Sequence, residues 1–155
     1  MKENTMRVIL QRVTHGSVTV EDKIVGSVEN GYVALVGVTQ GDTRADAALL
    51  AKKTAHLRIF EDENGKMNIS GLDAGAGVLV ISQFTLYADM RKGRRPSFTD
   101  AAKPDLAEPL VDHFAECLRQ AGIQQVEMGV FGAMMHVKIH NHGPVTIILD
   151  TDDLK

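Results

Sequence analysis

Alternation of apolar and polar residues near both ends of this 155-residue chain constrains its fold more than any other feature. Residues 8–13 alternate in this way, and Val18 and Val20 follow before a charged turn at 21–23. Residues 135–140 place Met and aliphatic side chains on one face and His and Lys side chains on the other. A period of two is typical of strands with one buried face. The sequence therefore predicts antiparallel strands in its first and last thirds.

Two Asn-Gly pairs predict tight turns, because both residue types tolerate a positive φ. Asn30-Gly31 predicts a hairpin whose returning strand covers residues 32–38, and Asn64-Gly65 predicts a second turn. Residues 77–86 are expected to form a buried strand, since they are almost continuously apolar up to Ser82.

Two segments have apolar residues at helical spacing. The first helix is expected to start at Asp42 as its N-cap and to extend to Leu57. The second follows Pro104 and is expected to stop at Gly122. The predicted fold class is α+β, with a mostly antiparallel sheet or barrel-like core and two main helices.

The composition, 44% hydrophobic and 24% charged, is that of one globular domain, which we expect to cover residues 1–155. No apolar run approaches the roughly 20 residues that span a bilayer, so no membrane partner is expected. Residues 1–5 lead into no secretion segment, and the expected location is the cytoplasm. Cys117 is the only cysteine, which excludes an intramolecular disulfide and favours a buried thiol.

The net charge of −3 gives the protein no general attraction for nucleic acid, but residues 91–95 form a short segment of positive charge. Four of its five positions are basic: Arg91, Lys92, Arg94 and Arg95. Such a cluster can hold phosphates without reading base sequence. A solvated surface loop explains it equally well, and both interpretations stay open at this point.

Other chemical signals are weaker. His136, His140 and His142 could share one strand face and bind zinc, but a solvated sheet face is preferred because no Asp, Glu or Cys cluster has ligand spacing. Ser82 lacks the glycines of a nucleophile elbow, and no dinucleotide or phosphate loop is present. We therefore expect no metal and no cofactor. Gly143-Pro144 is unusual beside strand residues, although an edge turn explains it.

Two segments resemble the signature motifs of the D-aminoacyl-tRNA deacylases, also called the D-tyrosyl-tRNA deacylase family. They are residues 82–86, Ser-Gln-Phe-Thr-Leu, and residues 141–146, Asn-His-Gly-Pro-Val-Thr. Residues 6–13, 92–98 and 129–135 also resemble that family in order and spacing, so the resemblance covers nearly the whole chain. Met6 matches the usual family start, which makes residues 1–5 an N-terminal extension. Gly16 and His142 depart from the family pattern, which has alanine and commonly an acidic residue there.

The resemblance implies a homodimeric enzyme that hydrolyses the ester of D-aminoacyl-tRNA, and also glycyl-tRNA as a further substrate. It implies a cis peptide bond between Gly143 and Pro144, whose carbonyl oxygens bind the α-ammonium group of a substrate held by the partner subunit. An L side chain would then collide with the pocket wall.

The resemblance also implies site residues. Ser82 and Gln83 would orient the terminal adenosine, and the backbone N–H groups of Phe84 and Thr85 would stabilise the oxyanion. Thr85 as a covalent nucleophile is an alternative. Phe131 and Met135 would line the adenosine pocket, or serve only as core residues. A different class of function is a noncatalytic RNA-binding module that uses the basic loop 91–95, the same loop that would bind tRNA in the enzyme.

Overall fold

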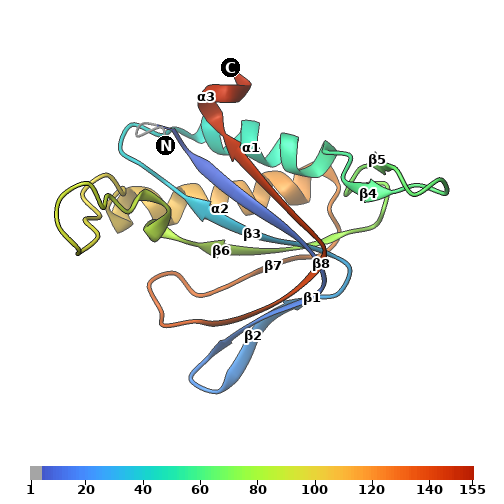
Figure 1. The fold of residues 1–155 in the computed structure, drawn as a ribbon, viewed down its shortest axis with the longest axis horizontal. Coiled ribbons are helices and arrows are strands. Elements are labelled where there is room, and N and C mark those ends of the chain that lie inside the picture. Colours follow the sequence, from blue (N-terminus) through green and yellow to red (C-terminus); the bar gives the residue numbers. More distant parts are fainter. Residues whose placement is uncertain (1–4) are drawn as a thin grey trace.

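A computed structural model describes residues 5–155 and shows a curled, six-stranded mixed sheet with two long helices packed on one face (Figure 1). The long strand β1 (Arg7–Val20) is at its centre. One edge of β1 pairs with β8 (His136–Asp150), and the other pairs with β3 (Gly31–Gly37) and then β2 (Lys23–Val28), all antiparallel. The strands β6 (Gly77–Ser82) and β7 (Val126–Met128) extend the sheet in parallel beyond β3. The predicted α+β class is confirmed.

The sheet nearly closes into a barrel because β2 returns against β7. A Cβ at Gly26 would lie 2.9 Å from the Met128 carbonyl oxygen, and the Gln125 amide donates a hydrogen bond to the Ser27 carbonyl oxygen at 3.2 Å. A small apolar core fills the space inside this curl, whereas a larger core lies between the sheet and the helices.

The predicted hairpin at Asn30-Gly31 is wrong. The strands β2 and β3 do not pair with each other, because both lie end to end along the same edge of β1. Gly31 has no positive φ, and its role is close approach: a Cβ there would lie 1.9 Å from the Gly77 carbonyl oxygen of β6. The turn at Asn64-Gly65 is confirmed, with Gly65 at φ 75° between β4 (Phe60–Glu61) and β5 (Met67–Ile69).

The buried strand expected over residues 77–86 ends early. It stops at Ser82, and a short 3-10 helix η1 (Phe84–Tyr87) follows. The reason is Tyr87, whose buried side chain points back into the protein with its hydroxyl 2.6 Å from the Thr5 carbonyl oxygen and 3.0 Å from that of Gly37. Turning the chain into η1 is what carries Tyr87 to this position.

Helix α1 (Arg44–His56) begins one residue later than predicted. Its N-cap is Thr43, which forms a reciprocal capping box with Asp46, whereas Asp42 instead accepts the Thr39 backbone N–H at 2.7 Å. Helix α2 (Pro104–Ala121) ends as expected at Gly122, with φ 114°. A final short helix, α3 (Thr151–Leu154), follows β8.

Three smaller observations complete the fold. Within residues 5–155, no helix is long and apolar enough to cross a membrane. The proposed N-terminal extension lies outside the described residues except for Thr5, which is buried and lies 2.9 Å from the Thr151 hydroxyl. Cys117 is only half-buried, with its sulfur 3.4 Å from His113 one helical turn away, and burial raises the pKa of its thiol.

Candidate active site

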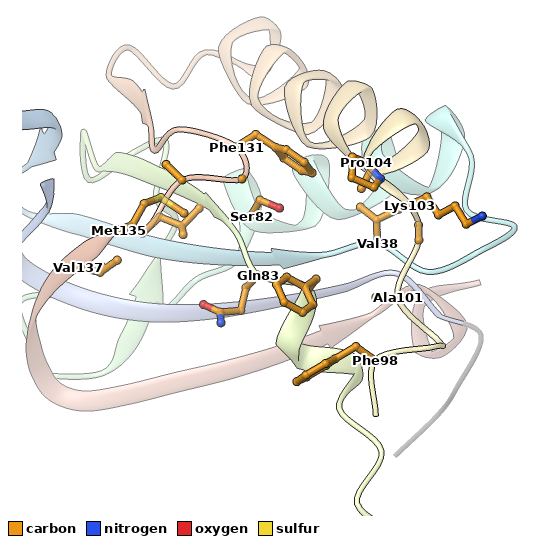
Figure 2. A pocket seen from close by; sticks show the side chains of 16 residues that line it. Val38, Ser82, Gln83, Phe98, Ala101, Lys103, Pro104, Phe131, Met135 and Val137 are labelled. Atoms are coloured by element: carbon orange, nitrogen blue, oxygen red, sulfur yellow. The ribbon is translucent and has the colours of Figure 1, made fainter. Parts of the chain in front are cut away.

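A pocket of about 600 Å³ opens where β6 ends and η1 begins (Figure 2). Ser82 and Gln83 form its polar wall, and Phe131 and Met135 from the segment between β7 and β8 form an apolar wall. The start of α2 and the segment before it contribute further lining residues, among them Phe98, Ala101, Ala102, Lys103 and Pro104. A mostly apolar cavity with a few polar groups at one edge suits a flat heterocycle such as a nucleobase.

The chain that leaves the pocket wall at Gln83 and Phe84 forms the first turn of η1. The Gln83 N–H donates to the Val36 carbonyl oxygen at 2.8 Å, which ties the start of η1 to β3. Within the described chain, the next two N–H groups, those of Phe84 and Thr85, have no backbone acceptor, as expected for the first turn of a helix. Two adjacent free donors can stabilise a developing oxyanion.

Thr85 itself is exposed, and its hydroxyl accepts a hydrogen bond from the Gln83 side chain. No histidine or carboxylate is among the residues that line the pocket, so nothing there resembles the base that activates a nucleophilic hydroxyl. The arrangement fits chemistry by positioning and backbone donors rather than by a triad.

Buried polar groups hold η1 in place from behind. Arg7 makes a bidentate ion pair with Asp150, at 2.6 and 3.0 Å, and its third nitrogen lies 3.5 Å from the Leu86 carbonyl oxygen. The hydrogen bonds to Asp150 raise the pKa of Arg7, and burial raises that of Tyr87. Both groups therefore keep their protonated forms, as donors, at neutral pH.

Gly143 and Pro144 lie elsewhere, in a bulge of β8. Asn141 pairs with Val13 and Thr146 with Gln11, so four residues of β8 face the single residue Arg12. The Gly143–Pro144 peptide bond is cis, Gly143 has φ 129°, and both residues are exposed. Neither lines the pocket of its own subunit.

Arg12 supports this bulge, and the sequence analysis missed it. Its buried guanidinium donates to the His142 carbonyl oxygen at 3.0 Å and to the Ile59 carbonyl oxygen at 2.7 Å, with Glu61 at 3.6 Å. The available signal was an arginine among the alternating residues 8–13. It carried no information about its partners, because Ile59 and His142 are distant in sequence.

The basic loop is less positive than its sequence suggests. Arg91 forms a bidentate pair with Asp89 at 2.8 and 2.9 Å, and this pairing lowers the pKa of Asp89 to about 2. Lys92, Arg94 and Arg95 are exposed. The segment that carries the loop leaves and returns beside the pocket, because the lining residues Phe84 and Phe98, which flank this segment, are in edge-to-face contact with ring centroids 5.0 Å apart.

The histidines form no metal cluster in the part of the chain that the structure describes. His136 and His140 are exposed on β8, and His140 lies against the ring of His15, with centroids 5.3 Å apart. His142 is in the bulge, where its carbonyl oxygen binds Arg12. The solvated sheet face preferred from the sequence matches these positions.

Comparison with known proteins gives one consistent result. The profile of the family described as D-Tyr-tRNA(Tyr) deacylase matches residues 9–150. A D-aminoacyl-tRNA deacylase of Thermomicrobium roseum is 62% identical over 150 residues, covering 97% of each chain. One from a Geobacillus species is 58% identical over 148 residues, covering 96% of this chain and 97% of the relative.

Two solved structures share the fold. One, titled c-Myc DNA Unwinding Element Binding Protein, has a TM-score of 0.86 and 38% identity, covering 92% of this chain and 97% of the other. The second, titled as a probable eukaryotic D-amino acid tRNA deacylase, has a TM-score of 0.82, 21% identity and coverages of 94% and 99%, and it supports the fold alone.

The sequence relatives define the class of this protein as a hydrolase, and the expectation of an enzyme is confirmed. The chain belongs to the D-Tyr-tRNA(Tyr) deacylase family, as the motifs at 82–86 and 141–146 indicate.

Proposed function

We propose that this protein hydrolyses the ester bond of D-aminoacyl-tRNA in the cytoplasm and releases the free D-amino acid and tRNA. The observation that carries the proposal is the pocket at the end of β6, an apolar cavity lined by no His or carboxylate and adjoining η1, whose first two N–H groups have no backbone acceptor. The names of the relatives supply the substrate class.

The terminal adenosine would occupy the apolar cavity between Phe131 and Met135, with Ser82 and Gln83 orienting its polar edge. The ester carbonyl oxygen would then lie against the N–H groups of Phe84 and Thr85. An aminoacyl ester is already activated, so fixed geometry and oxyanion stabilisation supply much of the rate. The ribose 2′-hydroxyl beside the ester can assist the attacking water, in keeping with a pocket lined by neither His nor carboxylate. No metal or cofactor takes part in this scheme.

Chirality would be tested by a second subunit of a homodimer. The Gly143–Pro144 bulge is exposed and does not reach the pocket of its own chain, but it can enter the pocket of a partner. Its carbonyl oxygens would accept hydrogen bonds from the α-ammonium group of the substrate. With ammonium and ester both fixed, an L side chain meets the wall, whereas glycine has no side chain and would be hydrolysed too.

The deciding experiment compares matched D- and L-aminoacyl-tRNA. We expect ester loss from the D substrate to exceed that from the L substrate by at least about a hundredfold, the size of discrimination that one steric clash of about 3 kcal/mol provides. Equal loss from both substrates would contradict the proposal.

A variant separates the two chemical routes. Thr85→Ala should keep kcat within about tenfold of the wild type, because the lost hydroxyl contributes only a hydrogen bond to Gln83. A covalent nucleophile would instead cost on the order of 10⁴ to 10⁶ in kcat. The thermal midpoint of the variant checks that the fold is intact, and a loss of the larger size with an unchanged midpoint would favour the covalent route.

The competing function is nucleic-acid binding without catalysis. It is favoured by the exposed Lys92, Arg94 and Arg95, which would bind tRNA in either scheme, and by the solved relative that carries a DNA-binding title. In both schemes Arg91 would contribute less, since Asp89 already pairs with it. Binding of tRNA with no ester loss from either enantiomer would select this function.

A further inference from the structure

A second cationic surface lies on α1, well apart in sequence from the basic loop. A groove of about 470 Å³ runs along the last turns of α1 and the residues that follow it. Four basic side chains line it: Lys52, Lys53, His56 and Arg58. Leu49, Leu57 and Leu154 provide its apolar floor, and no acidic residue is among the lining residues. With His neutral, the groove has a charge of +3 on a protein whose net charge is −3.

These charges are not neutralised inside the protein. Among residues 5–155, no carboxylate forms an ion pair with Lys52, Lys53 or Arg58. Arg58 donates instead to the amide oxygen of Asn68 at 3.2 Å, a neutral partner that orients the guanidinium and leaves its charge available. Lys155, close in sequence to the groove residue Leu154, is by contrast paired with Asp46 at 2.9 Å.

Stabilisation of the α1 dipole explains only part of this surface. Cations in the last turn of a helix typically contribute about 0.3–1 kcal/mol, and Lys53 and His56 are in that turn. Arg58 lies beyond the end of the helix, however, and Lys52 adds a further charge to the same groove. An open groove with fixed positive charges and no acidic lining matches the chemistry of a polyphosphate backbone.

The position of the groove indicates which bound nucleic acid it can contact. Ile59, the residue after Arg58, accepts a hydrogen bond from Arg12, and Arg12 also binds the His142 carbonyl oxygen in the bulge. One end of the groove, at Arg58, is therefore linked to the bulge through Arg12, whereas the pocket lies where β6 ends and has no lining residue in common with the groove.

We infer that this groove binds the phosphodiester backbone of the tRNA whose aminoacyl end occupies the partner subunit's pocket. The inference rests on the proposed function, since a bulge placed in the partner's pocket brings the neighbouring groove to the same substrate. Two basic surfaces from different subunits, the groove and the loop 91–95, then contact one tRNA.

The test is a double variant, Lys52→Gln/Lys53→Gln, in the full-length protein. Both side chains are exposed and have no ion pair or side-chain hydrogen bond with residues 5–155, so the fold is expected to persist. The matched control is Lys23→Gln/Lys138→Gln, which removes the same charge from exposed positions near the β1–β2 turn. Each protein is assayed on full-length D-aminoacyl-tRNA and on the D-aminoacyl ester of adenosine, which has no phosphodiester.

We expect KM for the tRNA substrate to rise about five- to tenfold at 0.1 M salt in the groove variant and to stay unchanged in the control. The kcat of the groove variant and its hydrolysis of the adenosine ester should both equal those of the wild type. The slope of log affinity for uncharged tRNA against log salt should fall by about 1.5, since each lost phosphate contact removes roughly 0.7–0.9. Equal KM values in variant and control, or an equal change on both substrates, would overturn the inference.

The outcome is separable from that of the proposed function. A wild type that hydrolyses neither substrate refutes the deacylase proposal, while the salt slope for uncharged tRNA still decides whether the groove binds RNA. If the double variant loses its thermal transition, the single variant Lys53→Gln replaces it. Its slope of log affinity for tRNA against log salt should then change by half as much.

Discussion

At the scale of single residues, the contacts around Arg12 have the clearest consequences. Its guanidinium is buried and joins two carbonyl oxygens from distant parts of the chain, those of Ile59 and His142. Hydrogen bonds to charged groups typically contribute about 1.5–3 kcal/mol each, so this side chain both stabilises the fold and fixes the bulge.

We expect Arg12→Met to lower the free energy of unfolding by about 3–6 kcal/mol, because it leaves two carbonyl oxygens without their charged donor. In the proposed reaction it should also reduce the ratio of D to L ester loss at least about tenfold, since the bulge loses its support. Urea unfolding and the paired D/L assay measure the two effects. A variant with lowered stability but an unchanged D/L ratio would show that Arg12 is structural only.

Residue contacts also explain what the sequence could predict about the site. The motif residues Ser82 to Thr85 are contiguous, so one resemblance identified the pocket wall. Arg12 and Lys103 reach the bulge and the pocket through tertiary contacts, and no local pattern reveals such partners. The sequence analysis overestimated the free positive charge of Arg91, because Asp89, just outside the basic cluster, pairs with it.

At the scale of elements, local sequence signals predicted the two long helices and the Gly65 turn correctly but did not predict which strands pair with each other. Gly122 and Gly65 act locally, through their own positive φ, and both were identified. The strand partners of β1 depend on contacts far along the chain, so Asn30-Gly31 was taken for a hairpin although β2 and β3 share one edge of β1. The early end of β6 likewise depends on the distant contacts of Tyr87.

The start of α1 supplies a pH-dependent prediction. Burial raises the pKa of Asp42 from its ordinary 3.8 to about 6. A folded-state pKa above the unfolded one means that the stabilising contribution is fully present below pH 3.8 and is lost as the pH rises through 6. Above that pH, the charged Asp42 carboxylate destabilises the folded protein relative to a neutral group.

We compare the free energy of unfolding of Asp42→Asn with that of the wild type at about pH 4 and about pH 7.5. The difference should shift in favour of the variant by up to about 3 kcal/mol at the higher pH, because a shift of one pKa unit corresponds to about 1.36 kcal/mol. Urea unfolding at the two pH values measures it. Asp112→Asn, which changes an exposed carboxylate on α2, is the control and should differ little from the wild type at either pH. Parallel changes in both variants would contradict the role of burial at Asp42.

At the scale of the whole molecule, pocket and bulge occupy separate places on one subunit, so the proposed site is complete only in a dimer. Large apolar side chains near the bulge and the pocket are uncovered, including Ile148 at 62% and Met134 at 91% exposure. In the proposed dimer, these side chains would be available for contact with the partner subunit.

Specific activity on D-aminoacyl-tRNA should therefore fall with dilution in proportion to the dimer fraction. In a single subunit, no bulge from a partner subunit enters the pocket. Activity measured across the concentrations at which sedimentation detects dissociation checks this expectation. A monomer with full activity and full D preference would contradict it.

The groups assigned here to the reaction, the amides of Phe84 and Thr85 and the carbonyls of the bulge, belong to the polypeptide itself. A substitution other than proline leaves these groups in the chain, so a side-chain change acts on the reaction by shifting the backbone, as we expect for Arg12 at the bulge. Reversing the preference for handedness would therefore require a different backbone path at the bulge of β8, and not only a different side chain.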